Sequence, residues 1–172
     1  MLSPELIKQA EINVKNYIEE GMLKKVSPKK EIIQVLVQKS DESLLETQRV
    51  KAPLWKIVIS YYSMFYIANA VLLDQGKKVG EKIPHKVTSD ALIVFVRRKL
   101  KKELIKDYER IKDYAFEETK TDVLLQNYEN ERNKRSQFQY NISEKAKESK
   151  ANTSKRRAEE FVFSMKKILF DK

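Results

Sequence analysis

The stretch from Leu54 to Gly76 constrains the fold of this chain more than any other. Pro53 stands before it, where the first turn of a helix tolerates proline, and Gly76 stands where helices commonly end. The residues between them are apolar on nearly every side of a helix: Leu54, Ile57, Val58, Ile59, Tyr61, Tyr62, Met64, Phe65, Tyr66, Ala68, Ala70, Val71, Leu72 and Leu73. A helix that is hydrophobic all round must be enclosed, by protein or by lipid.

Two enclosures are compatible with this stretch. Its length suits a bilayer, which takes ~20 apolar residues. However, Lys56 and Asn69 lie inside it, tyrosines cluster at its middle, and both flanks are basic. Because polar groups at bilayer depth are costly, we expect the central helix of a soluble bundle, with no membrane as a partner.

The composition favours one cytoplasmic, helical domain. A chain of 172 residues is most economically a single domain, residues 1–172, with a substantial core. It has only 3 glycines and 4 prolines, too few for a multi-stranded sheet with tight turns. The absence of cysteine excludes disulfides, thiol catalysis and thiolate metal sites. Residues 1–15 contain no apolar run after a basic start, so we expect no secretory signal.

The formal net charge is +10, from 35 Lys and Arg against 25 Asp and Glu. Such a surplus favours polyanionic partners, nucleic acid first, because counterions released from the phosphates drive binding. A lysine- and glutamate-rich surface that serves only solubility is equally compatible with this charge. Charge alone does not locate a binding surface.

Helix-start signals divide the first part of the chain. Ser3-Pro4-Glu5 combines a capping hydroxyl, a first-turn proline and an acid near the positive end of the helix dipole. The apolar spacing predicts that this first helix runs to about Leu23. Ser27-Pro28 repeats the start signal, and a second helix should reach the basic segment before Pro53, with a possible interruption at residues 40–43.

The second part of the chain continues the helical pattern after a basic loop. Residues 76–86 form the only segment with repeated glycine and a proline, so we expect a loop there. Helix should resume at about Thr88, either as one long helix or as two with a bend near Lys101. Thr121-Asp122 is a candidate cap for the next helix, and residues 141–144 are a candidate turn and cap for the last. The chain therefore predicts an all-α fold, an antiparallel bundle of about five to six helices.

The most polar stretch on these helices contains a cluster of cations. On one helical face Arg132 and Arg135 would lie close together, with Lys134 beside them. Two neighbouring guanidinium groups need an anion or carboxylates to hold them, and phosphate suits their forked donors. The alternative is a solvated face paired with nearby glutamates. The same two interpretations apply to the basic segment from Lys145 to Arg157.

The single histidine, His85, stands between Pro84 and Lys86 at the expected start of a helix. It could contact phosphate or a partner there, or simply cap the helix and close the loop. One histidine without nearby acids is not a metal site, since zinc needs three or four ligands, and we expect no metal and no cofactor. The tyrosines at the middle of the central helix are expected to serve core and interface packing.

The segment from Ile59 to Leu92 resembles the signature helix and following loop of HEPN domains, helical domains often found beside minimal nucleotidyltransferases. The residues that match in kind and order are Tyr61, Tyr62, Met64, Phe65, Ala68, Ala70, Leu72, Leu73, Gly76 and His85. A second match joins Arg132-Asn133 and Gln139-Tyr140 to a last helix that opens at Ser143-Glu144 and carries Ala158 and Phe161. The resemblance covers the chain from about Trp55 to its end.

Many members of that family are metal-independent ribonucleases that use an arginine, a polar residue directly after it, and a histidine several residues further on. Arg132 and Asn133 match the first two places, but Gln137, Phe138 and Gln139 occupy the histidine positions, with Tyr140 just beyond. Cleavage of a phosphodiester by general acid-base catalysis needs a group whose pKa lies near neutrality. The pKa of tyrosine, near ~10, suits that role poorly. The resemblance therefore implies a branch that binds and does not cut.

Three hypotheses follow. The first is a binding module that engages RNA or a nucleotide through Arg132, Lys134, Arg135, His85 and Lys86, as a homodimer and with a nucleotidyltransferase partner as the resemblance implies. The second is a ribonuclease toxin of a toxin-antitoxin pair, in which Arg132 stabilises the scissile phosphate, Asn133 follows it, and Tyr140 or His85 transfers the proton. The third is a helical interaction protein whose charge serves only solubility.

Overall fold

The computed structural model describes the backbone of residues 2–129 and 137–171, and the side chains of residues 2–117, 145 and 147–171. The helices are α1 (Pro4–Glu19), α2 (Lys30–Arg49), α3 (Pro53–Asp74), α4 (Pro84–Ala91), a π-helical turn η1 (Leu92–Val96), α5 (Lys102–Glu129) and α6 (Gln137–Phe170). Two short strands, β1 (Leu23–Lys25) and β2 (Lys77–Val79), complete the described part. The predicted all-α helical bundle is confirmed.

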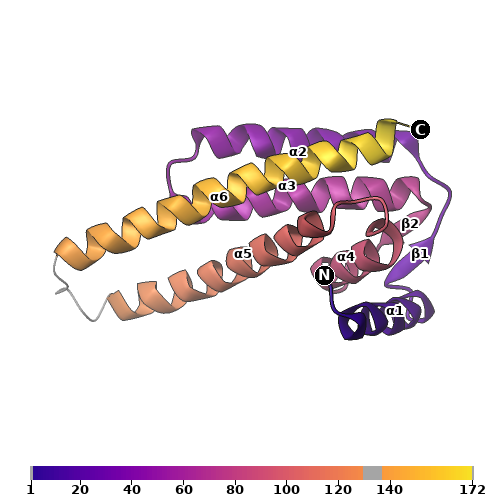
Figure 1. The fold of residues 1–172 in the computed structure, drawn as a ribbon, viewed down its shortest axis with the longest axis horizontal. Helices are drawn as coiled ribbons and strands as arrows, with labels where there is room; N and C mark the ends of the chain where they lie inside the picture. Colours follow the sequence, from indigo (N-terminus) through magenta and orange to yellow (C-terminus); the bar gives the residue numbers. More distant parts are fainter. Residues whose placement is uncertain (1, 130–136, 172) are drawn as a thin grey trace.

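The helix α3 is the centre of the bundle, as its apolar circumference predicts. It packs against α2, α6 and α5, and Figure 1 shows α2, α3 and α6 side by side with α5 running beneath them. Met64, Ile67 and Leu72 are fully buried. By length and composition alone α3 could cross a bilayer, but 61% of its most apolar window is buried inside the protein, as in a soluble core.

The start of α1 is confirmed and its end is not. The side-chain oxygen of Ser3 accepts a hydrogen bond from the backbone N–H of Leu6 at 3.2 Å, and Pro4 opens the helix. The helix ends at Glu19 because Gly21, with φ +71°, turns the chain into β1. Leu23, expected in the helix, is instead the first residue of a strand.

The possible interruption of the second helix does not occur, since α2 is continuous from Lys30 to Arg49. The hydroxyl of Ser40 donates to the carbonyl of Ser63 on α3, and that of Ser43 donates to the carbonyl of Lys39, both at 2.8 Å. These hydroxyl groups satisfy their hydrogen bonds without unwinding the helix.

The segment 76–86 is not wholly a loop, because β2 pairs with β1 in an antiparallel ribbon. Gly76, with φ +73°, ends α3 and lets the strands approach: an added Cβ there would lie 3.0 Å from the carbonyl oxygen of Val26. The described residues contain no extended sheet, as the scarcity of glycine predicts, but the few glycines present are enough for one ribbon of three-residue strands.

Helix resumes at Pro84, earlier than the expected Thr88. Ile83 before it adopts φ +44°, a conformation that a β-branched residue rarely takes. The hydrogen bonds that Asp90 accepts from Tyr17 and Asn13, at 2.9 and 3.0 Å, attach α4 to α1. The break near Lys101 is confirmed, since α5 begins at Lys102.

The expected caps at Thr121-Asp122 and at residues 141–144 are wrong, because both lie inside continuous helices, α5 and α6. The chain has no glycine and no proline after Pro84, so nothing in these segments stops a helix. Capping residues inside a helix cost only a fraction of ~1 kcal/mol each. In Figure 1, α5 and α6 form a long hairpin that extends beyond the rest of the bundle.

Candidate functional site

The described residues with the most unusual environment surround His85, in the first turn of α4. Its imidazole ring lies 4.6 Å from the ring of Phe65 and 5.0 Å from that of Phe116, measured between centroids. We use the name His85 cluster for the rings that join here from α3, α4 and α5: Tyr61, Tyr62, Phe65, Tyr66, His85, Tyr108 and Phe116. The spacing of Tyr61, Phe65 and their neighbours along α3 places these rings on adjoining turns.

A chain of hydrogen bonds runs into the core from His85. The hydroxyl of Tyr61 lies 2.8 Å from Nδ1 of His85 and 3.4 Å from the hydroxyl of Tyr108. Both phenols are buried, and burial raises the pKa of Tyr61 and of Tyr108 well above the ordinary value for tyrosine. Burial, followed by the positive charge of Lys112, lowers the pKa of His85. At neutral pH the phenols are therefore protonated and the imidazole is neutral.

With these protonation states, the direction of the hydrogen bond between Tyr61 and His85 determines the tautomer of His85. Tyr108 can donate to Tyr61 while Tyr61 donates to Nδ1, which satisfies both phenols. A neutral histidine whose Nδ1 accepts a hydrogen bond carries its proton on Nε2. In this tautomer His85 presents an N–H donor and its unprotonated nitrogen is already occupied, which suits binding better than general-base catalysis.

Charged residues of α5 border the cluster. The ammonium group of Lys112 contacts a carboxylate oxygen of Glu109 and donates to the hydroxyl of Ser89 at 3.0 Å. The other oxygen of Glu109 is buried without a hydrogen-bond partner among the described residues. Burial raises the pKa of Asp113, although the neighbouring Lys112 opposes this effect. Of the five groups with a shifted pKa among the residues whose side chains are described, four, those of Tyr61, His85, Tyr108 and Asp113, lie in or beside the His85 cluster, which is typical of functional sites.

One edge of the cluster is open to solvent. Phe116 is 39% exposed, and Tyr62, Phe65 and Tyr66 are half-buried. The ammonium group of Lys39, on α2, lies 5.6 Å from the centroid of the Tyr66 ring. Partly exposed rings beside cations are the combination on which nucleic-acid bases stack.

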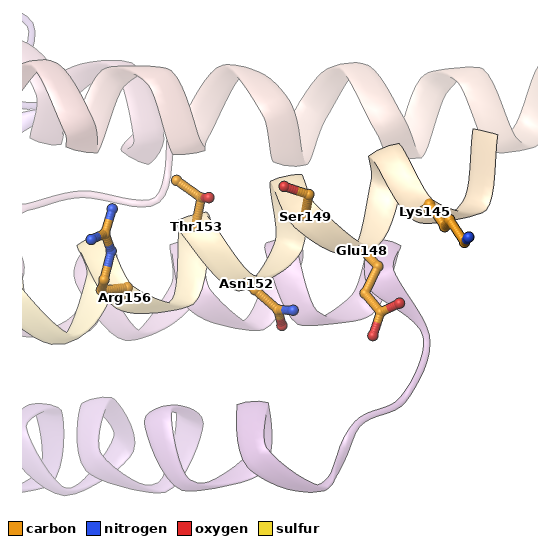
Figure 2. Close-up of a pocket in the computed structure, with 6 residues that line it drawn as sticks. All are labelled: Lys145, Glu148, Ser149, Asn152, Thr153 and Arg156. Carbon is orange, nitrogen blue, oxygen red and sulfur yellow. The ribbon is translucent and has the colours of Figure 1, made fainter. Parts of the chain in front are cut away.

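A second polar feature is the groove along α6 in Figure 2, with a volume of about 510 Å³. Its lining residues are Lys145, Glu148, Ser149, Asn152, Thr153 and Arg156. All six come from one helix and none is buried, so the groove is open surface. Lys56 of α3 donates to Asn152 at 3.2 Å across its edge. The groove offers polar contacts but does not enclose a ligand.

Most of the predicted site residues lie outside the described part of the chain. This holds for Arg132, Asn133, Lys134 and Arg135, which fall between the end of α5 and the start of α6, and for the side chain of Tyr140 within α6. His85 and Lys86 are described, and they lie together at the start of α4, with Lys86 exposed.

The sequence assigned His85 and the tyrosines of α3 to different roles, but the structure places them in one cluster. Tyr108, Lys112 and Phe116 were missed as site residues. A signal for Tyr108 and Phe116 existed in the apolar spacing of α5, but only the tertiary fold brings α5 beside His85. Among the described residues no group of three or more possible ligands could hold a metal ion.

No protein-family model matches the chain, and no curated protein or solved structure is significantly similar to it.

Proposed function

We propose that this chain is a HEPN-like helical module that binds single-stranded RNA, or a nucleotide of it, without cutting it. The observation that carries the proposal is the open edge of the His85 cluster, where half-buried rings lie with the ammonium group of Lys39 beside Tyr66, while His85 and Lys112 lie near each other on the side of α4 and α5. The net charge of +10 provides the long-range attraction for such a ligand.

The chemistry of the cluster supports stacking and hydrogen bonding. A base can stack on an exposed ring edge or face of Tyr62, Tyr66 or Phe116, and Nε2 of His85 can donate to a base or phosphate oxygen. Lys112 and Lys86 supply positive charge on the side of α4 and α5. Arg132, Lys134 and Arg135 add phosphate contacts in this proposal.

Binding without cleavage fits the state of the ionisable groups. A general base needs a free unprotonated nitrogen, and in the tautomer that this proposal assigns, Nδ1 of His85 accepts from Tyr61 and Nε2 carries the proton. The raised pKa values of Tyr61 and Tyr108 keep both phenols protonated at neutral pH. The resemblance to HEPN domains adds a homodimer and a nucleotidyltransferase partner to the proposal, which light scattering and co-purification would test.

The direct test measures binding of a labelled single-stranded RNA by fluorescence anisotropy, in EDTA. Replacing Tyr66 with alanine removes one half-buried ring, and loss of one stacked base costs about 1–3 kcal/mol, roughly a 5- to 150-fold weaker affinity. The matched control is Tyr114→Ala, because Tyr114 is also a half-buried tyrosine with a lysine, Lys150, over its ring at 3.9 Å. His85→Phe keeps a ring at position 85 and removes the N–H donor, so it should weaken binding as well.

The proposal predicts intact RNA and a loss of affinity in Tyr66→Ala that Tyr114→Ala does not share. Absence of RNA binding by the wild-type protein would overturn it. Cleavage in EDTA that disappears in Arg132→Ala would instead support the ribonuclease alternative, with the proton-transfer group still to be identified.

A further inference from the structure

The ribbon formed by β1 and β2 carries four lysines in six strand residues. We use the name lysine ribbon for Lys24, Lys25, Lys77 and Lys78. The register sets Lys24 directly opposite Lys78 and Lys25 directly opposite Lys77. Like charges directly opposite each other destabilise a strand pair, so this register is unfavourable for the ribbon itself.

The two lysine pairs face different sides of the ribbon. Successive side chains of a strand alternate between faces, and the pair of Leu23 and Val79 faces the core, with Leu23 fully buried. Lys24 and Lys78 therefore share the outer face, where both are exposed. Lys77 lies on the inner side, with its ammonium group 5.2 Å from the centroid of the Phe95 ring.

The ribbon is a built feature of the fold. Its hydrogen bonding continues beyond the strands, from Val26 to the carbonyl of Gly76 at 3.0 Å and from Gly80 to the carbonyl of Met22 at 2.8 Å. An added Cβ would lie 3.0 Å from a carbonyl oxygen at Gly76 and 3.2 Å from one at Gly80. Two of the three glycines in the chain thus permit the approach that brings the lysines together.

Within the described part of the chain, no carboxylate lies within ion-pair distance of any lysine of the ribbon. Edge lysines also deter unwanted strand pairing, which is the plainest explanation for them. However, a Lys opposite a Glu would protect the edge equally and would add a favourable cross-strand pair. The repeated Lys–Lys pairing therefore indicates an anion from outside the chain.

We propose that the outer face of the lysine ribbon, Lys24 and Lys78, binds the phosphodiester backbone of a nucleic acid. Ammonium groups on flexible stems are hydrated point charges that bind phosphates without reading sequence. An anionic membrane would call for an apolar anchor beside the lysines, and the outer face of the strands has none. The inference takes its ligand class from the proposed function, but its site is separate from the His85 cluster.

The test is the salt dependence of RNA affinity, measured by anisotropy between 50 and 200 mM KCl, a range over which counterion release is readily resolved. For a single strand, each phosphate contact contributes about 0.7 to the slope of log K against log salt, so the double variant K24Q/K78Q should lower the slope by about 1.4. The control K8Q/K15Q removes the same charge from two exposed lysines of α1 and should keep the wild-type slope. K24R/K78R should also keep it, and a circular-dichroism melt should show K24Q/K78Q folded.

Each outcome decides the inference. A lower slope in K24Q/K78Q alone supports it. An unchanged slope in that variant overturns it and leaves the proposed function standing, because Tyr66→Ala tests that function at another site. Equal decreases of the slope in K24Q/K78Q and K8Q/K15Q would mean that the ribbon contributes only as general surface charge, and would overturn the inference. Binding to phosphatidylserine vesicles that depends on Lys24 and Lys78, without an effect on RNA, would assign the face to a membrane, and no RNA binding by the wild type would overturn both proposals.

Discussion

The two halves of segment 76–86 have opposite environments. In the first half, the strand β2 sends Lys78 into solvent opposite another lysine. In the second half, α4 sends His85 among the rings of Phe65, Phe116 and Tyr61, where burial lowers its pKa. The segment between them, residues 80–83, ends in the unusual backbone conformation of Ile83, which turns the chain from ribbon to helix.

The two environments suit two different roles in binding, specificity for a ligand and long-range electrostatic attraction of it. The His85 cluster holds its rings and His85 in a packed environment, so in the proposed function it would distinguish ligands by shape and hydrogen bonding. Lys24 and Lys78, on the outer face of the lysine ribbon, carry flexible, solvated charges, which would attract any polyanion and respond strongly to salt. A ligand that uses both would gain specificity from one and association rate from the other.

The largest expected loss of stability comes from removing a buried ring of the His85 cluster. Tyr61 is 1% exposed and its ring contacts those of Tyr62, Phe65, His85, Tyr108 and Phe116. Truncating a buried aromatic residue typically costs about 3–5 kcal/mol, so Tyr61→Ala should lower the free energy of unfolding in urea by that amount. Trp55→Ala, at a residue that is 53% exposed, should change it by less than ~0.5 kcal/mol. A loss below about 1 kcal/mol in Tyr61→Ala would show that the cluster is not part of the cooperative core.

The next largest loss of stability is expected from a side chain added where the two strands of the ribbon approach. Gly76→Ala forces a side chain into a left-handed conformation, which costs about 1–2 kcal/mol, and also brings a Cβ against the carbonyl of Val26. Gly21→Ala is a matched control, because Gly21 has φ +71° but its nearest neighbour is a flexible lysine carbon at 3.7 Å. Urea denaturation of both variants should show the larger loss for Gly76→Ala, and the difference measures the close approach of the strands. Equal losses would contradict the packed ribbon.

How much of the fold can be predicted from the sequence depends on how local each sequence signal is. The central helix and the start of the first helix follow from Pro53, Gly76 and the Ser3-Pro4 pair, which act within one turn. The ribbon was missed because each strand is three residues long and its partner lies some 50 residues away, so neither strand shows an alternating pattern. The wrong caps in α5 and α6 have another origin: local capping residues do not by themselves end a helix where no glycine or proline stops it.

The candidate site was foreseen only in part, for the same reason. His85 was recognised because it is the sole histidine, and the tyrosines of α3 because they form a stripe. The cluster that joins them also includes Tyr108, which lies 47 residues from Tyr61 and reaches it only when α5 packs against α3. Sequence spacing cannot supply that contact.

A smaller effect tests the protonation state of the cluster. Because burial and Lys112 disfavour the charged imidazole, the folded protein resists a proton that the unfolded chain takes up below its pKa of about 6.5. The stability contributed by neutral His85 is therefore complete above about pH 6.5 and is lost as the pH falls from there toward the lower folded pKa. NMR should report the folded pKa directly, since the chain has one histidine, and that value should lie below 6.5.

The other ionisable groups around His85 define the control. Asp113 has a raised pKa, so its contribution has the opposite sign, falling as the pH rises above the ordinary value for aspartate, while Glu109 and Lys112 also face the cluster. The difference in unfolding free energy between wild type and His85→Phe isolates the histidine. If that difference does not change between pH 7.5 and 5, the imidazole is not enclosed as the ring contacts indicate.

The smallest expected effect is a change in stability at the lysine ribbon. Its sign should be opposite to that of the substitutions in the His85 cluster. Lys78→Glu places opposite charges across the ribbon where Lys24 now faces a lysine, and such a pair contributes roughly 0.2–1 kcal/mol. The variant should be more stable than the wild type in urea at low salt, with the gain shrinking as salt screens the pair. Adding Lys24→Glu restores like charges and should remove the gain, which a double-mutant cycle would measure. Replacing a residue that stabilises the fold lowers the free energy of unfolding, as we expect for Tyr61. If Lys78→Glu instead raises it and also weakens RNA binding, the lysine pair is unfavourable for the fold and favourable for a ligand. If Lys78→Glu instead lowers the free energy of unfolding, Lys78 stabilises the ribbon through an interaction other than the cross-strand pair with Lys24.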